Sequence, residues 1–290
     1  MNGILLIDKP AGWTSMDVCA KLRGAFREKR IGHSGTLDPM ATGLLVVFLG
    51  RATRAVEFAE ADAKVYEAAL RLGVTTDTQD VTGTVLREAP VSVTEVELEA
   101  VYEKFRGEIE QIPPMYSALK VNGQKLYQLA RRGREVERQP RRITIFSLEQ
   151  TGTAENGDVL LRVCCSKGTY IRTLCHDIGA ALGCGGAMSA LRRTRAGAFD
   201  ISGAHTLDAV LAAAEKGEAE ALLLPVDTLF SDCGAITLTA AQEKVIRNGG
   251  SFTCPAPEAI CRLYGKNGEF LALGQVRDGV MRPIKSFFEV

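Results

Sequence analysis

The segment from residue 32 to residue 43, GHSGTLDPMATG, carries the side chains best placed for chemistry, Asp38 and His33. Its glycines tolerate positive φ, Pro39 fixes its own φ, and this proline holds Asp38 in an extended conformation. A run of apolar residues, 44–49, follows directly. The pattern predicts a shaped loop that presents a functional carboxylate beside a rigid core strand. The simpler alternatives are an Asx turn at Asp38 and a solvated loop position for His33.

Other catalytic chemistries fit this segment poorly. A nucleophile elbow, G-x-S-x-G, begins at Gly32 but fails at Thr36, and the charged residues 27–30 do not predict the buried strand which that elbow requires. The histidines at positions 33, 176 and 205 are far apart and have no ligand at helical spacing, so we expect no metal site. The sequence contains neither the phosphate-binding motif G-x-x-x-x-G-K-[ST] nor a G-x-G-x-x-G motif after a predicted strand. We therefore expect no nucleotide cofactor.

Arg172 and Tyr66 are further candidates. Arg172 falls in the first turn of a predicted helix, off its apolar stripe, where the helix dipole disfavours a cation. We therefore expect a specific acidic partner, with a surface ion pair as the alternative. Tyr66 lies in an alternating segment, residues 64–73, which predicts a strand, and ordinary packing would also explain it. Only a fold that brings these residues to Asp38 would join them in one site.

Formal net charge is zero, with 35 basic and 35 acidic residues, but local charge is uneven. Between residues 117 and 142, eight cations face two acidic residues, which leaves six net positive charges; Tyr127 lies among them and Tyr116 directly before this range. This density favours contact with a polyanion over a merely solvated face. A second, shorter basic cluster spans residues 191–195. The cations of the first tract are Lys120, Lys125, Arg131, Arg132, Arg134, Arg138, Arg141 and Arg142.

The composition of the 290 residues, 46% hydrophobic and 24% charged, is ordinary for a globular protein. No apolar run is long enough for a transmembrane helix, and the N-terminus lacks the pattern of a signal peptide, so we expect a cytoplasmic protein with no membrane partner. The eight cysteines form no C-x-x-C pair. They are expected to be buried thiols in a reducing compartment rather than zinc ligands or disulfides.

Capping boxes and periodicity predict helices and strands along the chain. The first helix, capped by Thr14 and Asp17, should end near Gly32, and a polar loop is expected at residues 75–83. Pro113 and Pro114 should begin an excursion from the main fold. Further helices are expected after residue 50 through Ala61, after Thr94 up to Gly107, and at residues 171–182, 206–214 and 239–247. Strands are expected at residues 3–8, 44–49, 64–73, 143–148, 159–165, 259–264, 270–276 and 280–284. The last of these strands suggest a small β-rich domain whose boundary lies near residues 231–234.

Several long motifs occur in a fixed order: DKPxGxTS from Asp8, GHSGTLDPMATG from Gly32, KxY from Lys64, IPPMYSALK from Ile112, CSKGTYIRTL from Cys165 and LRRT from Leu191. Through these motifs the chain resembles, over nearly its full length, the bacterial TruB family of tRNA pseudouridine-55 synthases. The departures are small: Ser34 stands where threonine is usual, and Met40 where leucine is usual.

The resemblance implies an α+β fold. Residues 1–232 would form a pseudouridine synthase catalytic domain, in which helices flank a mixed, largely antiparallel sheet. A thumb insertion would occupy about residues 115–142, and residues 233–290 would form a small PUA-like RNA-binding domain. The implied partner is the T-arm stem-loop of tRNA, bound without an obligate protein partner by a monomer.

The resemblance also implies the reaction: uridine 55 in the T-arm loop of tRNA becomes pseudouridine by base flipping, without a cofactor. Asp38 would be the catalytic carboxylate; attack on C1′, addition to C6 and removal of a sugar proton all stay open as its step. Arg172 would be its partner and would favour the ionised carboxylate. An RNA-binding or RNA-folding factor, with catalysis secondary, is the alternative function. The residues that the resemblance assigns to the substrate are His33, which fills the vacated stack, Tyr66, which stacks on the uracil, Tyr170 and Leu191, which line the pocket, and Lys9.

Overall fold

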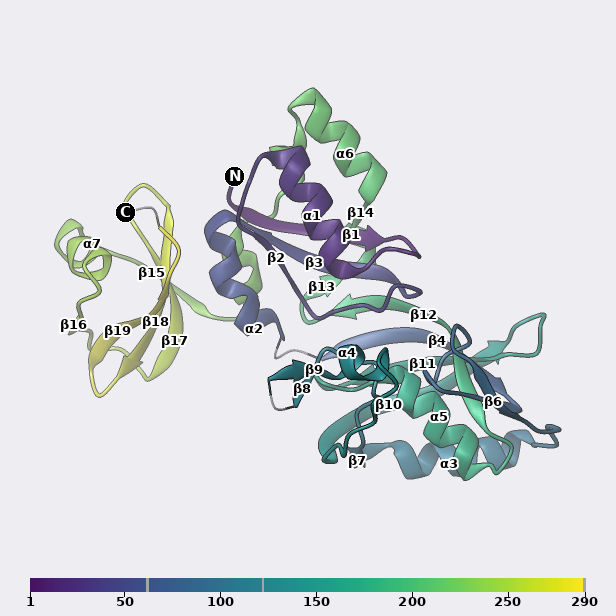
Figure 1. Ribbon diagram of the computed structural model, residues 1–290. Coiled ribbons are helices and arrows are strands. Elements are labelled where there is room, and N and C mark those ends of the chain that lie inside the picture. The colour runs from purple at the N-terminus through teal and green to yellow at the C-terminus, as the bar shows by residue number, and fades with distance from the viewer. Residues whose placement is uncertain (61–62, 122, 289–290) are drawn as a thin grey trace. The chain divides into compact units, whose positions relative to one another are not determined.

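The structure is a computed structural model that describes residues 1–60, 63–121 and 123–288. The chain folds into two compact units, and each is described by itself (Figure 1). The first unit comprises Met1–Asp38, Leu45–Glu60 and Ser202–Val290, and the second comprises Pro39–Leu44 and Ala61–Ile201. Asp38 is therefore the last residue of the segment that opens the first unit.

The sheet of the first unit contains β1 (Gly3–Lys9), β2 (Ile31–Ser34), most of β3 (Thr42–Leu49) and β14 (His205–Thr206). β1 lies between β14, to which it is parallel, and β3, while β2 runs antiparallel to β3. Consecutive residues of β1 and β3 are buried, so both faces of these strands are covered. The strands expected at residues 3–8 and 44–49 are confirmed.

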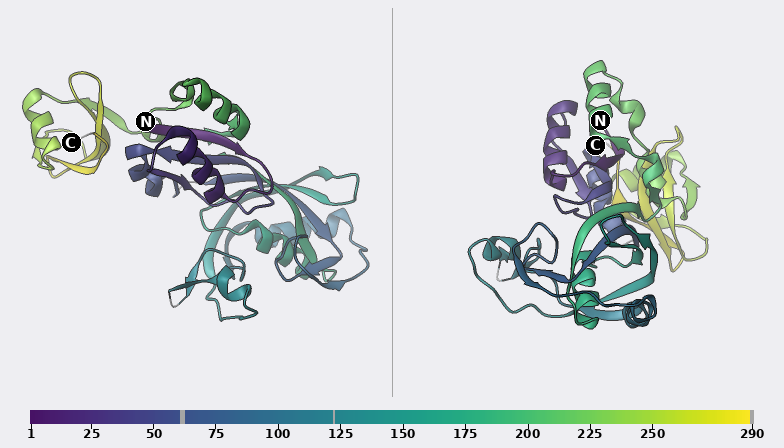
Figure 2. Two further views of the ribbon diagram at one scale, coloured as in Figure 1. Left: turned by 45° about the horizontal axis from the view of Figure 1, so that its top comes forward. Right: turned by 90° about the vertical axis from the view of Figure 1, so that its right-hand side faces the viewer.

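Helices α1 (Ser15–Phe26) and α6 (Leu207–Lys216) cover one face of this sheet (Figures 1 and 2). Threonine N-caps start both helices, and Thr14 with Asp17 forms the predicted capping box. The apolar stripes of the two helices meet the strands in one core cluster, which includes Val18, Leu22, Val210, Ile7 and Val47.

The segment after α1 corrects two expectations. The helix ends at Phe26 rather than near Gly32, because Arg27 adopts a positive φ of 51° and closes it. Residues 32–34, expected in a loop, lie on β2, where His33 is paired with Val47 of β3. Pairing with a long buried strand overrides the weak local preference for a loop. The irregular part of the predicted loop is confined to residues 35–41.

Short helical turns complete this part of the first unit. The 3₁₀ turn η1 (Gly50–Ala55) and α2 (Val56–Glu60) follow β3 and confirm the expected helix up to Glu60, whereas Ala61 lies outside the described residues. Three further 3₁₀ turns lie along the chain on either side of α6: η2 (Ile201–Gly203), η3 (Ala219–Leu222) and η4 (Val226–Phe230).

The end of the chain forms a separate sheet with its own core. Its strands lie in the order β15 (Gly234–Thr237), β17 (Ala259–Tyr264), β18 (Phe270–Arg277), β19 (Val280–Ser286) and β16 (Phe252–Thr253). Helix α7 (Ala240–Arg247) begins at Thr239 with the predicted capping box. The expected β-rich segment is confirmed; the exact boundary at residue 232 stays a prediction. The core includes Leu238, Ile246, Leu263, Leu271 and Met281.

The sheet of the second unit carries most of the candidate residues. Its strands lie in the order β12 (Gly186–Ala196), β4 (Lys64–Leu72), β11 (Val159–Cys165), β10 (Arg141–Thr153) and β7 (Gly107–Gln111), each antiparallel to the next. The start of β3 pairs in parallel with β12, and β13 (Phe199–Asp200) pairs antiparallel to β12. Helix α5 (Ile171–Ala181) packs on β12 and β4, and α3 (Glu95–Phe105) packs on α5 and β10.

Two segments extend from this sheet. Part of the expected polar loop forms a hairpin of β5 (Val74–Thr76) and β6 (Val85–Glu88), with residues 77–84 between them. Residues 112–140, hereafter the excursion, contain β8 (Lys120–Val121), β9 (Gln124–Lys125) and α4 (Leu126–Ala130). Arg141 and Arg142, expected in the thumb, instead begin β10, because Arg141 pairs with Gln111 and Arg142 with Glu110 of β7.

The predicted α+β class, with a mixed and largely antiparallel sheet flanked by helices, is confirmed. Among the described residues, no helix is both long and apolar enough to span a membrane.

Candidate active site

Asp38 is held in place through the residue before it. The buried hydroxyl of Ser15, in the first turn of α1, accepts a hydrogen bond from the Leu37 amide (2.9 Å) and donates one to the Leu37 carbonyl oxygen (3.2 Å). Leu37 itself is buried, whereas Asp38 is half-buried. Both backbone groups of Leu37 are thus fixed to the start of a capped helix. The backbone directly before the carboxylate is therefore held by α1, whereas the sequence pointed to the core strand after the loop and gave no sign of Ser15.

His33 and Lys9 also belong to the first unit. His33 is half-buried on β2. Lys9 ends β1 and is fully buried, and its Nζ donates hydrogen bonds to the carbonyl oxygens of Pro10 (2.9 Å) and Trp13 (2.6 Å). Lys9 therefore closes the turn that leads into α1. Substrate contact by His33 and by Lys9 stays a prediction.

In the second unit the sheet brings Tyr66 and Leu191 together. Tyr66 of β4 is paired with Val163 of β11 on one side and with Arg193 of β12 on the other. Leu191 is paired with Ala68, two residues along β4, so Leu191 and Tyr66 are diagonal neighbours on the same face. Both side chains are largely buried, with 8% of each exposed.

Arg172 is buried in the first turn of α5 and is not part of a surface ion pair. Its Nη1 donates to the Thr78 carbonyl oxygen (3.0 Å) and lies 3.7 Å from Oδ2 of Asp80, while its Nη2 donates to the Tyr116 carbonyl oxygen (2.8 Å). The expected acidic partner is therefore found, and within this unit it is Asp80. Pairing of Arg172 with Asp38, which belongs to the other unit, stays a prediction.

Asp80 is itself rigidly presented. Its Oδ1 accepts hydrogen bonds from the hydroxyl of Thr78 (2.9 Å) and from the amide (2.9 Å) and hydroxyl (2.5 Å) of Thr82. Only 5% of Asp80 is exposed. Sequence reasoning treated this stretch as a polar loop, although an aspartate followed two residues later by threonine is a signal for an Asx turn.

Tyr170 is the N-cap residue of α5, and its backbone is held by Gln111 at the end of β7. The Gln111 side chain accepts a hydrogen bond from the Tyr170 amide (2.8 Å) and donates one to the Tyr170 carbonyl oxygen (3.1 Å). Gln111 is buried and immediately precedes the excursion. This contact fixes the start of the helix that carries Arg172, and no local sequence signal pointed to it.

Arg193 belongs to the second, shorter basic cluster at residues 191–195. Only 1% of Arg193 is exposed, and its Nε donates to the Leu44 carbonyl oxygen (2.7 Å). The approach of β12 to β3 is so close that a Cβ on Gly43, which has a φ of 96°, would lie 2.3 Å from the Arg193 carbonyl oxygen. The cluster is divided because an irregularity in the pairing of β12 with β4, between Arg193 and Arg195, interrupts the alternation of the strand: Arg193 is buried and Arg195 is exposed.

Cysteine chemistry is disfavoured at this site. Cys165, paired with the buried Lys64 of β4, has its pKa raised to about 12 by burial, although a hydrogen bond with Thr169 and the charges of Lys64 and Arg193 lower it. Burial likewise raises the pKa of Cys175 to about 12. Such thiols stay protonated near neutral pH and are weak nucleophiles. The eight cysteines are free thiols, and the described residues contain no cluster of three or more histidine, cysteine or acidic side chains that could hold a metal.

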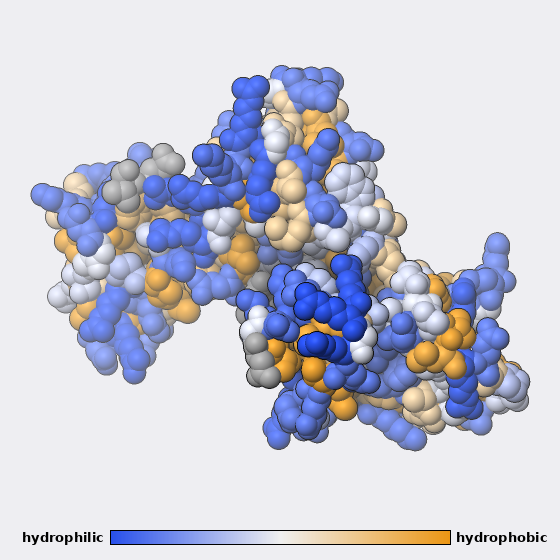
Figure 3. Space-filling model, viewed as in Figure 1, coloured by the Kyte–Doolittle hydropathy of each residue, from blue (hydrophilic) through white to orange (hydrophobic). Residues whose placement is uncertain are grey.

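The basic tract is exposed along the excursion. Figure 3 shows strongly hydrophilic side chains gathered over the α4 region, next to apolar ones. Lys125 and Arg131 lie 5.7 and 5.5 Å from the centre of the Tyr127 ring. Arg138 pairs with Glu135 (2.8 Å), and Nη1 of Arg142 lies 3.5 Å from Oε1 of Glu108. The exposed cations are Lys120, Arg131, Arg132, Arg134, Arg141 and Arg142.

Comparison with known proteins points to one family. Residues 23–171 match the family described as "TruB family pseudouridylate synthase (N terminal domain)", and residues 172–231 match "tRNA pseudouridylate synthase B C-terminal domain". The chain is 46% identical over 295 residues to tRNA pseudouridine synthase B of Ralstonia nicotianae, with 98% of this chain and 93% of that protein covered. It is 43% identical over 298 residues to the protein of the same name from Syntrophomonas wolfei, with 99% of each covered.

Solved structures agree with this result. The chain matches, with a TM-score of 0.75 and 25% identity, a structure described as an H/ACA RNP bound to a substrate RNA containing 2′-deoxyuridine. It matches a Cbf5-Nop10-Gar1 complex with a TM-score of 0.75 and 27% identity. Each match covers 99% of this chain and 85% of the other chain. The expected pseudouridine synthase fold is confirmed.

Proposed function

Because the chain belongs to the TruB family and is a tRNA pseudouridine synthase, we propose that it isomerises uridine 55 in the T-arm loop of tRNA, with Asp38 as the catalytic carboxylate. The observation that carries the assignment of Asp38 is the double hydrogen bond between Ser15 and Leu37, which fixes the backbone directly before a half-buried carboxylate. A catalytic group needs such a rigid base, because small displacements of a reacting group are expensive in rate.

The reaction rearranges atoms already present in the substrate. The N1–C1′ bond of uridine breaks, the uracil turns within the site, C5 forms the new bond to C1′, and the C5 proton leaves as the N1 position gains one. No electron acceptor or external group enters the balance. Asp38 acts by attack on C1′, by addition to C6 or by removal of a sugar proton, and each of these steps needs an ionised carboxylate.

The remaining candidates have roles in opening and holding the RNA. Extrusion of a stacked base costs a few kcal/mol, and His33 would fill the space that the base leaves. Tyr66 would stack on the uracil, a contact worth about 1–3 kcal/mol, with Leu191 beside it and Tyr170 at the start of α5. Arg172 would hold the carboxylate of Asp38. Lys9 is proposed as a further substrate contact, and its bonds to Pro10 and Trp13 would fix its position.

The exposed cations of the excursion would bind the phosphates of the T-arm, and the C-terminal sheet would contact the same RNA elsewhere. Backbone phosphates are recognised chiefly by lysine and arginine, and binding through them depends strongly on salt. We propose that the protein acts in the cytoplasm as a single chain.

Replacement of one carboxylate tests this proposal. Asp38→Asn should abolish pseudouridine formation in an unmodified T-arm stem-loop and keep its affinity for that RNA. Asp208→Asn, at an exposed aspartate in the first turn of α6, is the matched control and should be fully active. Full activity of Asp38→Asn would refute the assignment. Binding by the wild-type protein without any pseudouridine formation would favour the alternative of an RNA-folding factor.

A further inference from the structure

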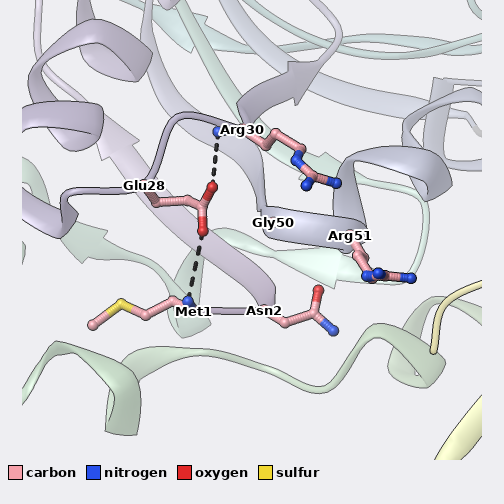
Figure 4. Close-up of a pocket in the computed structure, with 6 residues that line it drawn as sticks. All are labelled: Met1, Asn2, Glu28, Arg30, Gly50 and Arg51. Atoms are coloured by element: carbon pink, nitrogen blue, oxygen red, sulfur yellow. Dashed lines mark hydrogen bonds and ion pairs between the residues drawn. The ribbon is translucent and has the colours of Figure 1, made fainter. Parts of the chain in front are cut away.

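The turn between α1 and β2, residues 27–30, carries an unexplained group of cations in the first unit. Arg27, Lys29 and Arg30 are exposed there, at a place distant in sequence from the excursion. Arg30 also lines a pocket of about 290 Å³ together with Met1, Asn2, Glu28, Gly50 and Arg51 (Figure 4). We call Arg27, Lys29 and Arg30 the 27–30 corner.

The one acidic side chain of this turn is engaged elsewhere. Oε1 of Glu28 accepts a hydrogen bond from the Arg30 amide (2.9 Å), and Oε2 lies 3.6 Å from the Met1 amino group. Within the described residues, no hydrogen bond or ion pair involves the side chains of Arg27, Lys29 or Arg30. Three neighbouring cations are therefore left without a counter-charge, an arrangement that attracts an anionic partner.

Arg51 adds a second guanidinium to the pocket. The Gly50 amide, directly before Arg51, donates a hydrogen bond to the Arg30 carbonyl oxygen (2.8 Å), so the backbones of the two arginines are tied together. Figure 4 shows both guanidinium groups extending from neighbouring segments toward the same side. Nη1 of Arg51 also donates to the Phe288 carbonyl oxygen, which restrains that side chain. Two guanidinium groups beside one pocket, one of them restrained, suit the fork geometry by which arginine binds phosphate.

From these observations we propose that the 27–30 corner binds backbone phosphates of the substrate tRNA. The site goes beyond the proposed thumb contact and rests on the proposed T-arm substrate. β2 begins directly after Arg30, and His33 follows three residues later, a distance of about 10 Å along a strand. If His33 enters the opened base stack, the corner lies within reach of the phosphates of nearby nucleotides. The established tRNA substrate supplies the required polyanion, which favours RNA over an acidic protein.

The test neutralises the corner without disturbing any bond in the structure. The variant Arg27→Gln/Lys29→Gln/Arg30→Gln is compared with Arg87→Gln/Lys104→Gln/Lys216→Gln, which removes the same charge from exposed cations elsewhere. Affinity for an unmodified T-arm stem-loop is measured between 50 and 200 mM salt, along with kcat and KM. Each phosphate contact contributes about 0.7–0.9 to the salt slope, so loss of three contacts lowers it by about two to three. Over that fourfold range of salt, the wild type should then lose about 20- to 40-fold more affinity than the corner variant.

The outcomes separate this inference from the function itself. A raised KM and a reduced salt slope for the corner variant alone, with kcat unchanged, support the phosphate contact. Salt slopes that are equal for the two variants overturn it, as does a weaker affinity at an unchanged slope, which would point to a protein partner for the corner. Wild-type protein that forms no pseudouridine in this RNA refutes the proposed function, whatever the variants bind.

Discussion

Arg172 and Arg193 in the second unit contrast with Arg131, Arg132 and Arg134 in the excursion of the same unit. The buried pair donate to backbone carbonyl oxygens at 2.7–3.0 Å, and Arg172 also lies beside Asp80. The exposed group has no hydrogen-bonded side-chain partner among the described residues, apart from the contact of Arg131 with the Tyr127 ring. The same side chain therefore serves two purposes, to fix a position and to attract a polyanion.

This difference follows from the surroundings of each charge. A buried charge is tolerated only when hydrogen bonds and an opposite charge replace its hydration, so its function depends on geometry. An exposed charge keeps its hydration and acts at long range, so its effect depends on salt and on number. At the buried arginines, substitutions that keep the charge but change the shape of the charged group should impair function. At the exposed arginines, substitutions that remove the charge should weaken RNA binding and its salt dependence.

The strongest test concerns the close approach that allows Arg193 to be buried. Gly43→Ala should lower the free energy of unfolding by about 3–5 kcal/mol, since its Cβ would meet the Arg193 backbone at a positive φ. Gly157→Ala is the matched control because Gly157 has a φ of 83° and no atom within 4 Å of its Cβ position. That change should cost only about 1–2 kcal/mol. Urea unfolding measures the free energy of unfolding of both variants. Equal losses of this free energy would contradict the close packing of β12 on β3.

The next effect concerns catalysis. Arg172→Lys keeps the charge, but a single ammonium group does not reproduce the fork that reaches Thr78, Tyr116 and Asp80 together. Loss of about 2–3 kcal/mol of charged hydrogen bonding should lower kcat about 100-fold and change KM much less. Single-turnover pseudouridine formation measures this change. The control is Arg162→Lys, on an exposed residue of β11, which should keep wild-type turnover; a similar loss there would mean that the effect is not specific to the buried site.

A smaller effect is expected for Arg193→Lys. This change removes the bond from Nε to the Leu44 carbonyl oxygen, which restrains β3 a few residues after Asp38. We expect kcat to fall about tenfold with KM nearly unchanged, because one hydrogen bond of a charged donor is lost. Arg195→Lys provides the comparison on the same strand, since Arg195 is exposed and its Nε donates to the Gly197 carbonyl oxygen (2.9 Å). Equal losses from the two variants would show that the buried bond has no special role.

The contrast also explains what the sequence could predict. Local signals succeeded: capping boxes at Thr14, Thr94 and Thr239 located α1, α3 and α7, and alternation located β4 and β11. Contacts between residues distant in sequence were missed, because no local pattern of residue types indicates which distant residues will meet in the fold. Ser15 holds Leu37 across 22 positions, and Gln111 holds Tyr170 across 59. The strand at residues 31–34 was missed for the same reason, since β3 induces it.

The smallest effect on catalysis belongs to the excursion. Arg131→Gln/Arg132→Gln/Arg134→Gln should leave kcat unchanged, raise KM and lower the salt slope of RNA affinity by about two to three. Arg138→Gln supplies the control within the same tract, because its guanidinium already pairs with Glu135 at 2.8 Å and donates to the Pro113 carbonyl oxygen. A cation that is already paired with a carboxylate neutralises little phosphate charge, so few counterions leave the RNA when it binds. This variant should therefore keep the wild-type salt slope. If Arg138→Gln changes the slope as much per charge as the triple variant, pairing in the free protein does not distinguish cations that bind RNA from those that hold the fold. The salt slope of RNA affinity would then not distinguish partly buried, paired arginines from exposed ones.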